Sequence, residues 1–415
     1  MEIVYPRACG VDVHKSFIVA VICISESIKP RYIKKRFSTF NNQLIQFRDW
    51  LIENNCHNVC MESTGKYYIP VYNALEGHIP NVVVANPKWV KAIKGEKDDN
   101  KDAKWIADLF KFGIVRSSYI PEKDIRILRE FTRYQYKLVN IRSSEKNRFQ
   151  NALTVGNCKL DLVFTDVFGK SASSIVDTIL SDEPYTSEDI LSAVEGTNLN
   201  QYQKARIKIV QKHMEYVDSL LDEVQHHIDM MVESYENYIQ LLMTIPGVNR
   251  KSAIIIISEL GIDVSQWSSA RKLAAWAGLA PGHNESAGKK KSVKISKAGI
   301  YLEPCLVQVA HAAVKDKTCS YYAEKFGRIS KRRGKKRAII AIARKILVAI
   351  YHIVKTGEVF NPSDMADVET TKEQRIAYIT NNFRNAFNQL SRTGLSEEEI
   401  LSIIIKKSNN SPQTE

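Results

Sequence analysis

The sequence predicts an α/β domain at the amino-terminal end, followed by a longer and mainly helical remainder. Val- and Ile-rich segments of strand length alternate with helical patterns within residues 8–112, whereas apolar residues recur at helical spacing within residues 122–153, 198–238 and 335–356. The chain has 415 residues, of which 44% are hydrophobic and 25% are charged. This composition excludes collagen-like, low-complexity and wholly disordered proteins, and the length accommodates several domains.

The amino-terminal elements follow a definite order. Residues 8–24 read as two strands of a hairpin, and residues 31–39 (RYIKKRFST) as a third strand with basic residues between the apolar ones. A helix begins after Phe40, a short strand ends at Glu62, residues 67–79 are mostly helical, residues 81–87 form a buried strand, and residues 99–112 form a helix. This is the order of elements in the ribonuclease-H-like fold, although several other α/β folds share it.

The middle of the chain predicts two long amphipathic helices, over residues 122–153 and 198–238. They flank a variable stretch, residues 156–195, that contains Gly, Ser, Asp and Pro. Both an antiparallel coiled-coil arm and a compact helical bundle fit this pattern.

The carboxy-terminal part predicts a helix, a tight turn and a second helix over residues 239–261. A loop-rich portion extends from there to Lys297, and helices follow over residues 298–326 and 335–356. The tail after Phe360 is helical in parts and ends in a polar, frayed segment.

Positive charge is concentrated in one part of the chain. The net charge is +13, and residues 241–360 alone contribute +15. Residues 1–120 contribute +5, residues 121–240 contribute −5, and residues 361–415 contribute −2. A basic excess confined to one segment predicts a surface that binds a polyanion, most simply a nucleic acid.

Other classes of protein are disfavoured. The sequence has no apolar run long enough for a membrane span and no secretory signal layout, which predicts a cytoplasmic protein. The seven cysteines are scattered without a CxxC pair, so we expect reduced thiols. Cys56, His57 and Cys60 form one tight cluster, which reads as buried structural residues more readily than as metal ligands.

Four carboxylates are candidates for a catalytic metal site. Asp12 lies inside an apolar strand segment and Glu62 ends another, where an unpaired carboxylate would be costly to bury. Asp99 and Asp102 are three residues apart at a helix start, so they share one face. In a ribonuclease-H-like sheet all four would meet and hold Mg²⁺, most simply as two ions. The two helical acids could equally cap the helix, and His14 could either reach a scissile phosphate or face solvent.

The basic segment contains three motifs. Ile245-Pro246-Gly247-Val248-Asn249 resembles a helix-hairpin-helix turn, with Asn249 in place of the usual second glycine. Ser286 lies among small residues just before three lysines, although a lone loop serine is ordinarily a turn residue. A basic run then leads into an apolar helix; it comprises Lys331, Arg332, Arg333, Lys335, Lys336 and Arg337.

Together, GVDVHK, MESTGKY, NPKWVKAIKG with KDDNKDAKWIADLF, and IPGV with AGLAPGHNESAGKKKSVKISKAG resemble the DEDD-type transposases of bacterial and archaeal insertion sequences. The family is the one numbered one hundred and ten, which is related to the Piv DNA invertase. The resemblance covers roughly residues 8–115 and 240–355, while the middle of the chain matches only in helical character.

The resemblance implies a RuvC-like domain at 1–120, a coiled-coil arm with an insertion at 121–238, a transposase domain at 239–360 and a helical tail with a disordered end at 361–415. The family's DEDD residues correspond to Asp12, Glu62, Asp99 and Asp102, with Asp98 standing where the family has Thr. The catalytic serine corresponds to Ser286, with Ser292 in reserve and Ala287 where the family has Gly.

The resemblance further implies Mg²⁺, donor and target double-stranded DNA, and a noncoding bridge RNA that guides the enzyme. Because Ser286 is remote in sequence from the acids, we expect a composite site in a homo-oligomer, a dimer or a tetramer, associated with the nucleoid. The expected nucleic-acid contacts are Lys66, Gly247, Asn249, Arg250, Lys251, Lys289, Lys290, Lys291, Lys294, Lys297 and the six residues of the basic run.

Two alternative functions use the same residues differently. A Holliday-junction nuclease would use the carboxylates with water as nucleophile, so it would form no covalent adduct and would not depend on Ser286. A binding protein with structural acids would keep its affinity after Asp12→Asn and would ignore divalent ions.

Overall fold

The structure is a computed structural model that describes residues 2–27, 29–63, 65–87, 99–181, 194–280, 284–286, 289–292 and 299–362, with isolated positions at 364, 380, 387, 396, 398 and 399. Side chains are described except at 99, 100, 284–286 and 289–292. The chain forms two compact units, Met1–Arg126 and Ile127–Glu415, and each is considered by itself.

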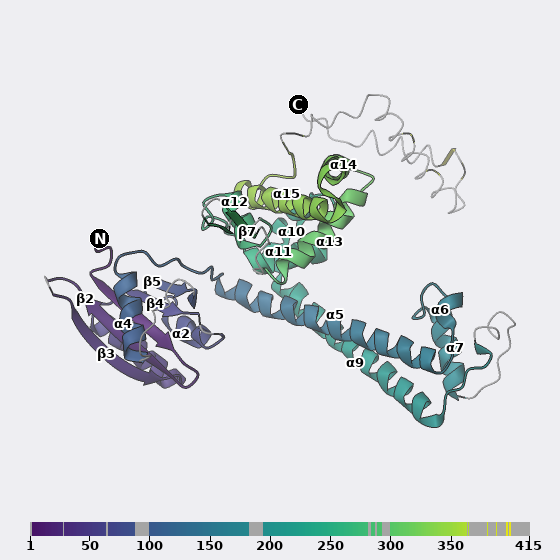
Figure 1. Cartoon of the computed structure of the whole chain (residues 1–415), viewed down its shortest axis with the longest axis horizontal. Helices are drawn as coiled ribbons and strands as arrows, with labels where there is room; N and C mark the ends of the chain where they lie inside the picture. Colours follow the sequence, from purple (N-terminus) through teal and green to yellow (C-terminus); the bar gives the residue numbers. More distant parts are fainter. Residues whose placement is uncertain are drawn as a thin grey trace. The chain divides into compact units, whose positions relative to one another are not determined.

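The first unit is built on a mixed sheet of five strands (Figure 1). The strands are β1 (Arg7–Val13), β2 (Phe17–Ile24), β3 (Arg31–Ser38), β4 (Asn58–Glu62) and β5 (Asn81–Ala85), and they lie in the order β3-β2-β1-β4-β5. The β1–β2 and β2–β3 pairs are antiparallel, whereas β1–β4 and β4–β5 are parallel. This order and these directions agree with the expected ribonuclease-H-like sheet.

The two faces of the sheet carry different helices. Alternate residues of β1, namely Cys9, Val11 and Val13, belong to a core that they share with α1 (Asn41–Glu53) and α2 (Tyr68–Leu75). The intervening residues face α4 (Asp99–Phe110), since Ala8 packs with Ile106 and Phe110 of that helix. The period-two alternation of a strand therefore places Asp12 on the α4 face.

The second unit begins with two long helices, α5 (Lys123–Val155), whose first residues still belong to the first unit, and α9 (Gln201–Met231). They lie side by side and antiparallel (Figure 1), because Gln135 donates to Gln225 at 2.8 Å and Arg142 lies 2.5 Å from Asp218. The insertion between them contains α6 (Leu160–Val163) and α7 (Lys170–Ser181), whose apolar residues form a small core with the end of α5 and the start of α9.

The remainder of this unit is a module of helices packed around α15 (Lys335–Thr356), whose buried face contacts several neighbours. Its other elements are η1 (Glu233–Tyr235), α10 (Glu236–Met243), α11 (Arg250–Leu260), α12 (Ala270–Trp276), a hairpin of β6 (Asn284–Ser286) and β7 (Lys289–Ser292), α13 (Leu302–Lys315) and α14 (Tyr321–Arg333). The amino-terminal sheet followed by a mostly helical remainder confirms the predicted combination of classes.

Three details differ from the sequence-based expectation. The helix predicted over residues 198–238 ends at Met231, and η1 and the start of α10 follow it. The helix predicted over residues 298–326 is two helices, because the chain turns at Asp316, whose carboxylate accepts hydrogen bonds from the backbone N–H and the hydroxyl of Thr318. Helix α12 lies in the portion expected to be loop-rich, and Ser269 caps it by accepting from the Lys272 N–H. Most of the helical tail expected at 361–415 lies outside the described residues. None of the described helices is long and apolar enough to span a bilayer.

Candidate active site

Two of the predicted acids lie at the same end of neighbouring parallel strands and on the same face of the sheet. In the β1–β4 register, Gly10 pairs with Cys60 and Val11 with Met61, so the next residues along, Asp12 and Glu62, lie side by side. Cys60 packs on the α4 face, and the period-two alternation puts Glu62 there as well. Both carboxylates are partly buried. The sheet therefore brings together at one end two acids that are far apart in the sequence.

Helix α4 approaches this end of the sheet because Gly10 has no side chain. A Cβ at Gly10 would lie 2.1 Å from the Ala103 carbonyl oxygen and 2.4 Å from the Ala107 nitrogen. Strand and helix run in opposite directions, since Ala8 lies against Ile106 and Phe110 while Gly10 lies against Ala103. The amino-terminal end of α4 therefore points to the end of β1 that carries Asp12.

The other two predicted acids lie at that end of α4. Asp102 immediately precedes Ala103 and is partly buried, and Asp99 is the first residue of the helix. Asp98 lies outside the described residues. Among the residues whose side chains are described, no group of three or more His, Cys, Asp or Glu side chains is close enough to hold a metal ion. The placement brings the backbone positions of four acids to one region, and carboxylate oxygens are the donors that suit Mg²⁺.

His14 contacts the first of these acids. Its Nε2 lies 3.0 Å from Asp12 Oδ2, and its ring packs on Phe17 with the centroids 4.5 Å apart. His14 lies just after β1, in the turn that leads to β2, and its side chain is 37% exposed. The histidine thus shares the acid face of the sheet with Asp12, rather than facing solvent alone.

The predicted nucleophile is in the second unit. Ser286 ends β6 and pairs with Lys289 of β7, while the intervening positions 287 and 288 lie outside the described residues. Ser292, the reserve candidate, pairs with Asn284 at the other end of the hairpin. Lys289, Lys290 and Lys291 all lie on β7, whereas Lys294 and Lys297 lie outside the described residues. Ser286 therefore stands at the turn end of a hairpin whose second strand is rich in lysine.

The turn between α10 and α11 is occupied by internal contacts. Gly247 has a φ of 84°, and a Cβ there would meet the α13 backbone at 2.5 Å from Ala313 N. Asn249 caps α11 by accepting from the Ser252 N–H, and Arg250 donates to both oxygens of Glu236 at 2.8 and 2.6 Å. These contacts explain the motif as packing and capping. Asn249, Arg250 and Lys251 are all exposed, so these contacts leave open their predicted role in binding nucleic acid.

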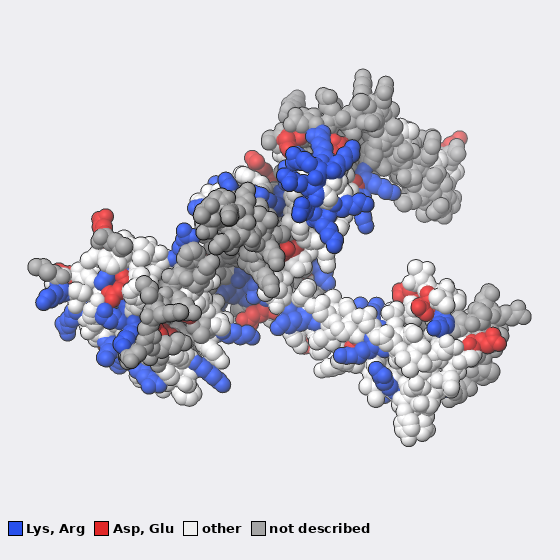
Figure 2. Space-filling model, in the orientation of Figure 1, with Lys and Arg blue, Asp and Glu red and all other residues white. Residues whose placement is uncertain are grey.

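The basic run is exposed and lies where α14 ends and α15 begins. Lys331, Arg332 and Arg333 form the last turn of α14, and Lys335, Lys336 and Arg337 form the first turn of α15. Figure 2 shows Lys and Arg side chains gathered over this part of the module. Within the described part of the chain, none of the six has a carboxylate partner. Lys66, the remaining predicted contact, is exposed in the loop that follows Glu62.

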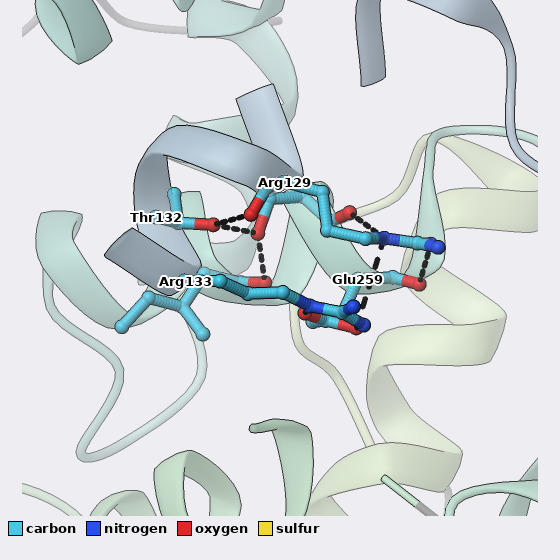
Figure 3. A network of polar contacts seen from close by, with 6 residues as sticks. Arg129, Thr132, Arg133 and Glu259 are labelled. Carbon is cyan, nitrogen blue, oxygen red and sulfur yellow. Dashed lines mark hydrogen bonds and ion pairs between the residues drawn. The ribbon is translucent and has the colours of Figure 1, made fainter. Parts of the chain in front are cut away.

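The serine-bearing module is joined to α5 by a buried ionic network that no local sequence pattern indicates (Figure 3). Glu259 of α11 is 3% exposed, and Arg133 donates to both of its carboxylate oxygens at 2.7 and 2.8 Å. Arg129 donates to the carbonyl oxygens of Ser258 and Glu259, which are among the last carbonyls of α11. The network caps the carboxy-terminal end of α11 and fixes the position of α11 against α5.

A ribonuclease-H-like sheet with acids at the ends of adjacent strands, linked to a basic helical module, defines the class of protein as a nucleic-acid-processing enzyme. Two transposase family profiles match the chain: a DEDD-type IS110 transposase profile over residues 9–156, and one described as "Transposase IS116/IS110/IS902 family" over residues 239–326. The chain belongs to the IS110 family of DEDD transposases, enzymes that cleave and rejoin DNA.

Individual relatives agree with this family. A probable family 20 transposase of Pseudomonas aeruginosa is 25% identical over 275 residues, which are 65% of this chain and 75% of the relative. The transposase of insertion sequence element IS1111A from Coxiella burnetii is 23% identical over 290 residues, 68% and 73% of the two chains. A pilin gene-inverting protein of Moraxella bovis is 31% identical over 132 residues, 29% and 38% of the two chains.

Proposed function

We propose that this transposase moves its insertion sequence by a serine-dependent recombination in which Asp12, Glu62, Asp99 and Asp102 form a Mg²⁺ site. The observation that carries the proposal is the adjacency of Asp12 and Glu62 on one face of the sheet, at the end to which the start of α4 points. An all-carboxylate donor set suits a hard divalent cation better than a softer one. When bound, Mg²⁺ would neutralise charge on the phosphoryl oxygens and ease loss of the attacking proton.

Ser286 would supply the nucleophile. Its Oγ attacks the scissile phosphorus, a serine–phosphate bond forms, and the bond from phosphorus to the departing strand end breaks. The serine proton leaves and the departing oxygen takes up a proton. A hydroxyl of another strand end then attacks the phosphoserine, which joins the two strands and restores the serine. The balance requires no oxidant and no hydrolysis, so the strands are exchanged rather than degraded.

Sequence choice would come from a bridge RNA, and the protein would contribute contacts to phosphates. The basic run supports this division of labour, because three cations in the first turn of α15 oppose the helix dipole unless an anion lies beside them. Exposed cations without carboxylate partners are suited to a phosphate backbone of either nucleic acid. A composite site assembled from two copies of the chain would bring Ser286 to the carboxylates.

The proposal is tested by incubating the purified full-length chain with end-labelled donor and target DNA, the element's noncoding RNA and Mg²⁺. We expect strand cleavage together with a DNA-linked protein band on a denaturing gel. Ser286→Ala should abolish both products, whereas Ser292→Ala, a matched change in the same hairpin, should retain them. Asp12→Asn should abolish cleavage while DNA binding remains.

Other outcomes would identify other functions. Cleavage without any protein-linked DNA and without dependence on Ser286 would indicate a metal-dependent junction nuclease that uses water. Cleavage that proceeds equally well when the RNA is left out would remove the guide from the account but keep the serine chemistry.

A further inference from the structure

A second basic surface lies on β3, beside the candidate carboxylates and outside the residues expected to contact nucleic acid. Arg36 pairs in register with Val19 of β2, and Val19 pairs with Asp12 of β1. Lys34 is likewise level with Gly10 through Val21. Two strand spacings amount to about 10 Å, so a cation on β3 lies within reach of the neighbouring phosphates of a strand bound at Asp12. A strand whose scissile phosphate lies at Asp12 would thus place a nearby phosphate at Arg36.

Both cations face the same side of the sheet as the carboxylates. Val19 and Val21, their partners in register, pack with Ala103 of α4, and so does Tyr32 of β3. Strand alternation therefore puts Lys34 and Arg36 on the α4 face, whereas Arg31 and Lys35 project from the opposite face, where Ile33 and Phe37 join the other core. All four cations are exposed. Figure 2 shows Lys and Arg side chains over the part of the first unit where β2 and β3 lie.

Arg36 is held in place by an aromatic ring rather than by an acid. Its guanidinium carbon lies 3.6 Å from the centroid of the Phe17 ring, and Phe17 packs in turn on His14, which contacts Asp12. Stacking occupies the flat face of a guanidinium and leaves its edge N–H groups for a phosphate. Neither Lys34 nor Arg36 has a carboxylate partner within the described residues. Asp108 of α4 already binds Lys104, Lys111 and the hydroxyl of Tyr32 on β3.

We infer that Lys34 and Arg36 form a phosphate-binding track on β3 that holds the backbone of the DNA strand entering the carboxylate site. The inference rests on the proposed function for the position of the scissile phosphate. Charged residues on an edge strand also prevent sheets from pairing edge to edge, and that role applies to all four cations of β3 alike. A function specific to the α4 face applies only to Lys34 and Arg36.

The test uses this difference. Binding of a 30-base-pair DNA duplex and of a 30-nucleotide single-stranded RNA to the full-length chain is measured by fluorescence anisotropy over a range of salt concentrations, without divalent ions. The Lys34→Ala/Arg36→Ala variant should bind the duplex about tenfold more weakly, and its plot of log affinity against log salt should be less steep by about 2. The Arg31→Ala/Lys35→Ala variant, with the same charge change on the opposite face, should match the unchanged protein within about twofold.

Three results would overturn the inference: equal losses in the two variants, no loss in either, or a loss confined to RNA, which would assign the track to the guide. Arg36→Gln, which removes the guanidinium but keeps a polar side chain, should reproduce part of the loss with little change in melting temperature. Because the measurement needs neither Mg²⁺ nor Ser286, failure of the covalent chemistry would leave its outcome unaffected.

Discussion

At the scale of single residues, Gly10 has the most direct influence on the candidate site. A methyl group there would collide with the backbone of α4 at 2.1 Å, and backbone cannot move aside as a flexible side chain can. We expect Gly10→Ala to displace α4 from β1, to destabilise the first unit by roughly 2 kcal/mol or more, and to reduce DNA cleavage. Faster hydrogen exchange of β1 and α4 amides would report the displacement.

The matched control for this change is Gly327→Ala. Gly327 lies within α14, and a Cβ there meets nothing within 4 Å. Alanine in a helix interior, where its methyl group meets nothing, should be neutral or stabilising by up to about 1 kcal/mol. If Gly10→Ala were as harmless as this control, close packing of α4 on β1 would not be what positions the acids.

Asp108 gives the first unit a defined dependence on pH. Burial would raise the pKa of Asp108, but hydrogen bonds from Lys111, Lys104 and Tyr32 outweigh it and hold this pKa below its usual 3.8. A lowered folded-state pKa contributes stability above the unfolded value, and this contribution disappears as the pH falls through the folded value. Asp108→Asn should therefore lower the melting temperature at pH 7, and this decrease should be smaller at pH 3, below the usual pKa of the group. An equal difference in melting temperature between the variant and the unchanged protein at both pH values would contradict this assignment.

A functional residue can be predicted from the sequence when its immediate neighbours in the chain make it unusual. Asp12 and Glu62 are conspicuous because each is a carboxylate in an apolar strand segment. The significance of Gly10 depends on Ala103 and Ala107, and that of Glu259 depends on Arg133, partners distant in sequence that only the fold brings near. The alternation of basic and apolar residues over residues 31–39 was visible, but the face on which Lys34 and Arg36 lie depends on the register with β2.

At the scale of elements, α5 carries two arginine ion pairs of very different expected strength. Arg133 pairs with Glu259, which is buried, whereas Arg142 pairs with Asp218, and both of those side chains are about 40% exposed. Arg133→Ala leaves a buried carboxylate short of its main partner and should cost about 3 kcal/mol. Arg142→Ala should cost less than about 1 kcal/mol. Denaturant unfolding of the two variants provides the comparison, and equal costs would show that the network of Figure 3 contributes little.

The bounds of an element can be predicted where apolar residues recur at helical spacing and a glycine flanks the segment at each end. The helix over residues 335–356 was predicted with the bounds that α15 has, since it begins after Gly334 and ends before Gly357. The break at Asp316 was missed because the apolar period continues on both sides of it, and α12 was missed because seven residues are too few for a periodic signal. The sequence feature that indicates α12 is Ser269, a residue type that commonly caps the start of a helix.

At the scale of the whole molecule, the charge of residues 241–360 should govern the affinity for nucleic acid. Each phosphate contact that is lost should make the plot of log affinity against log salt less steep by about 1. Replacing Lys331, Arg332 and Arg333 by alanine should therefore make duplex binding weaker and less salt-dependent. Arg206, Lys208 and Lys212 on α9 are exposed and provide a control with the same change in charge. Equal effects of the two triple variants would mean that net charge matters and its location does not.

The central claim is that a serine in the β6–β7 hairpin becomes covalently joined to DNA, and the identity of the joined peptide tests it most directly. Trypsin should release residues 273–289 as one peptide in which Ser286 is the only hydroxyl-bearing side chain, while Ser292 falls in a different peptide. After cleavage of DNA with RNA and Mg²⁺, digestion with nuclease and trypsin should yield this peptide with the mass of a nucleotide added. A nucleotide on another peptide, or active cleavage with no modified peptide, would contradict the account.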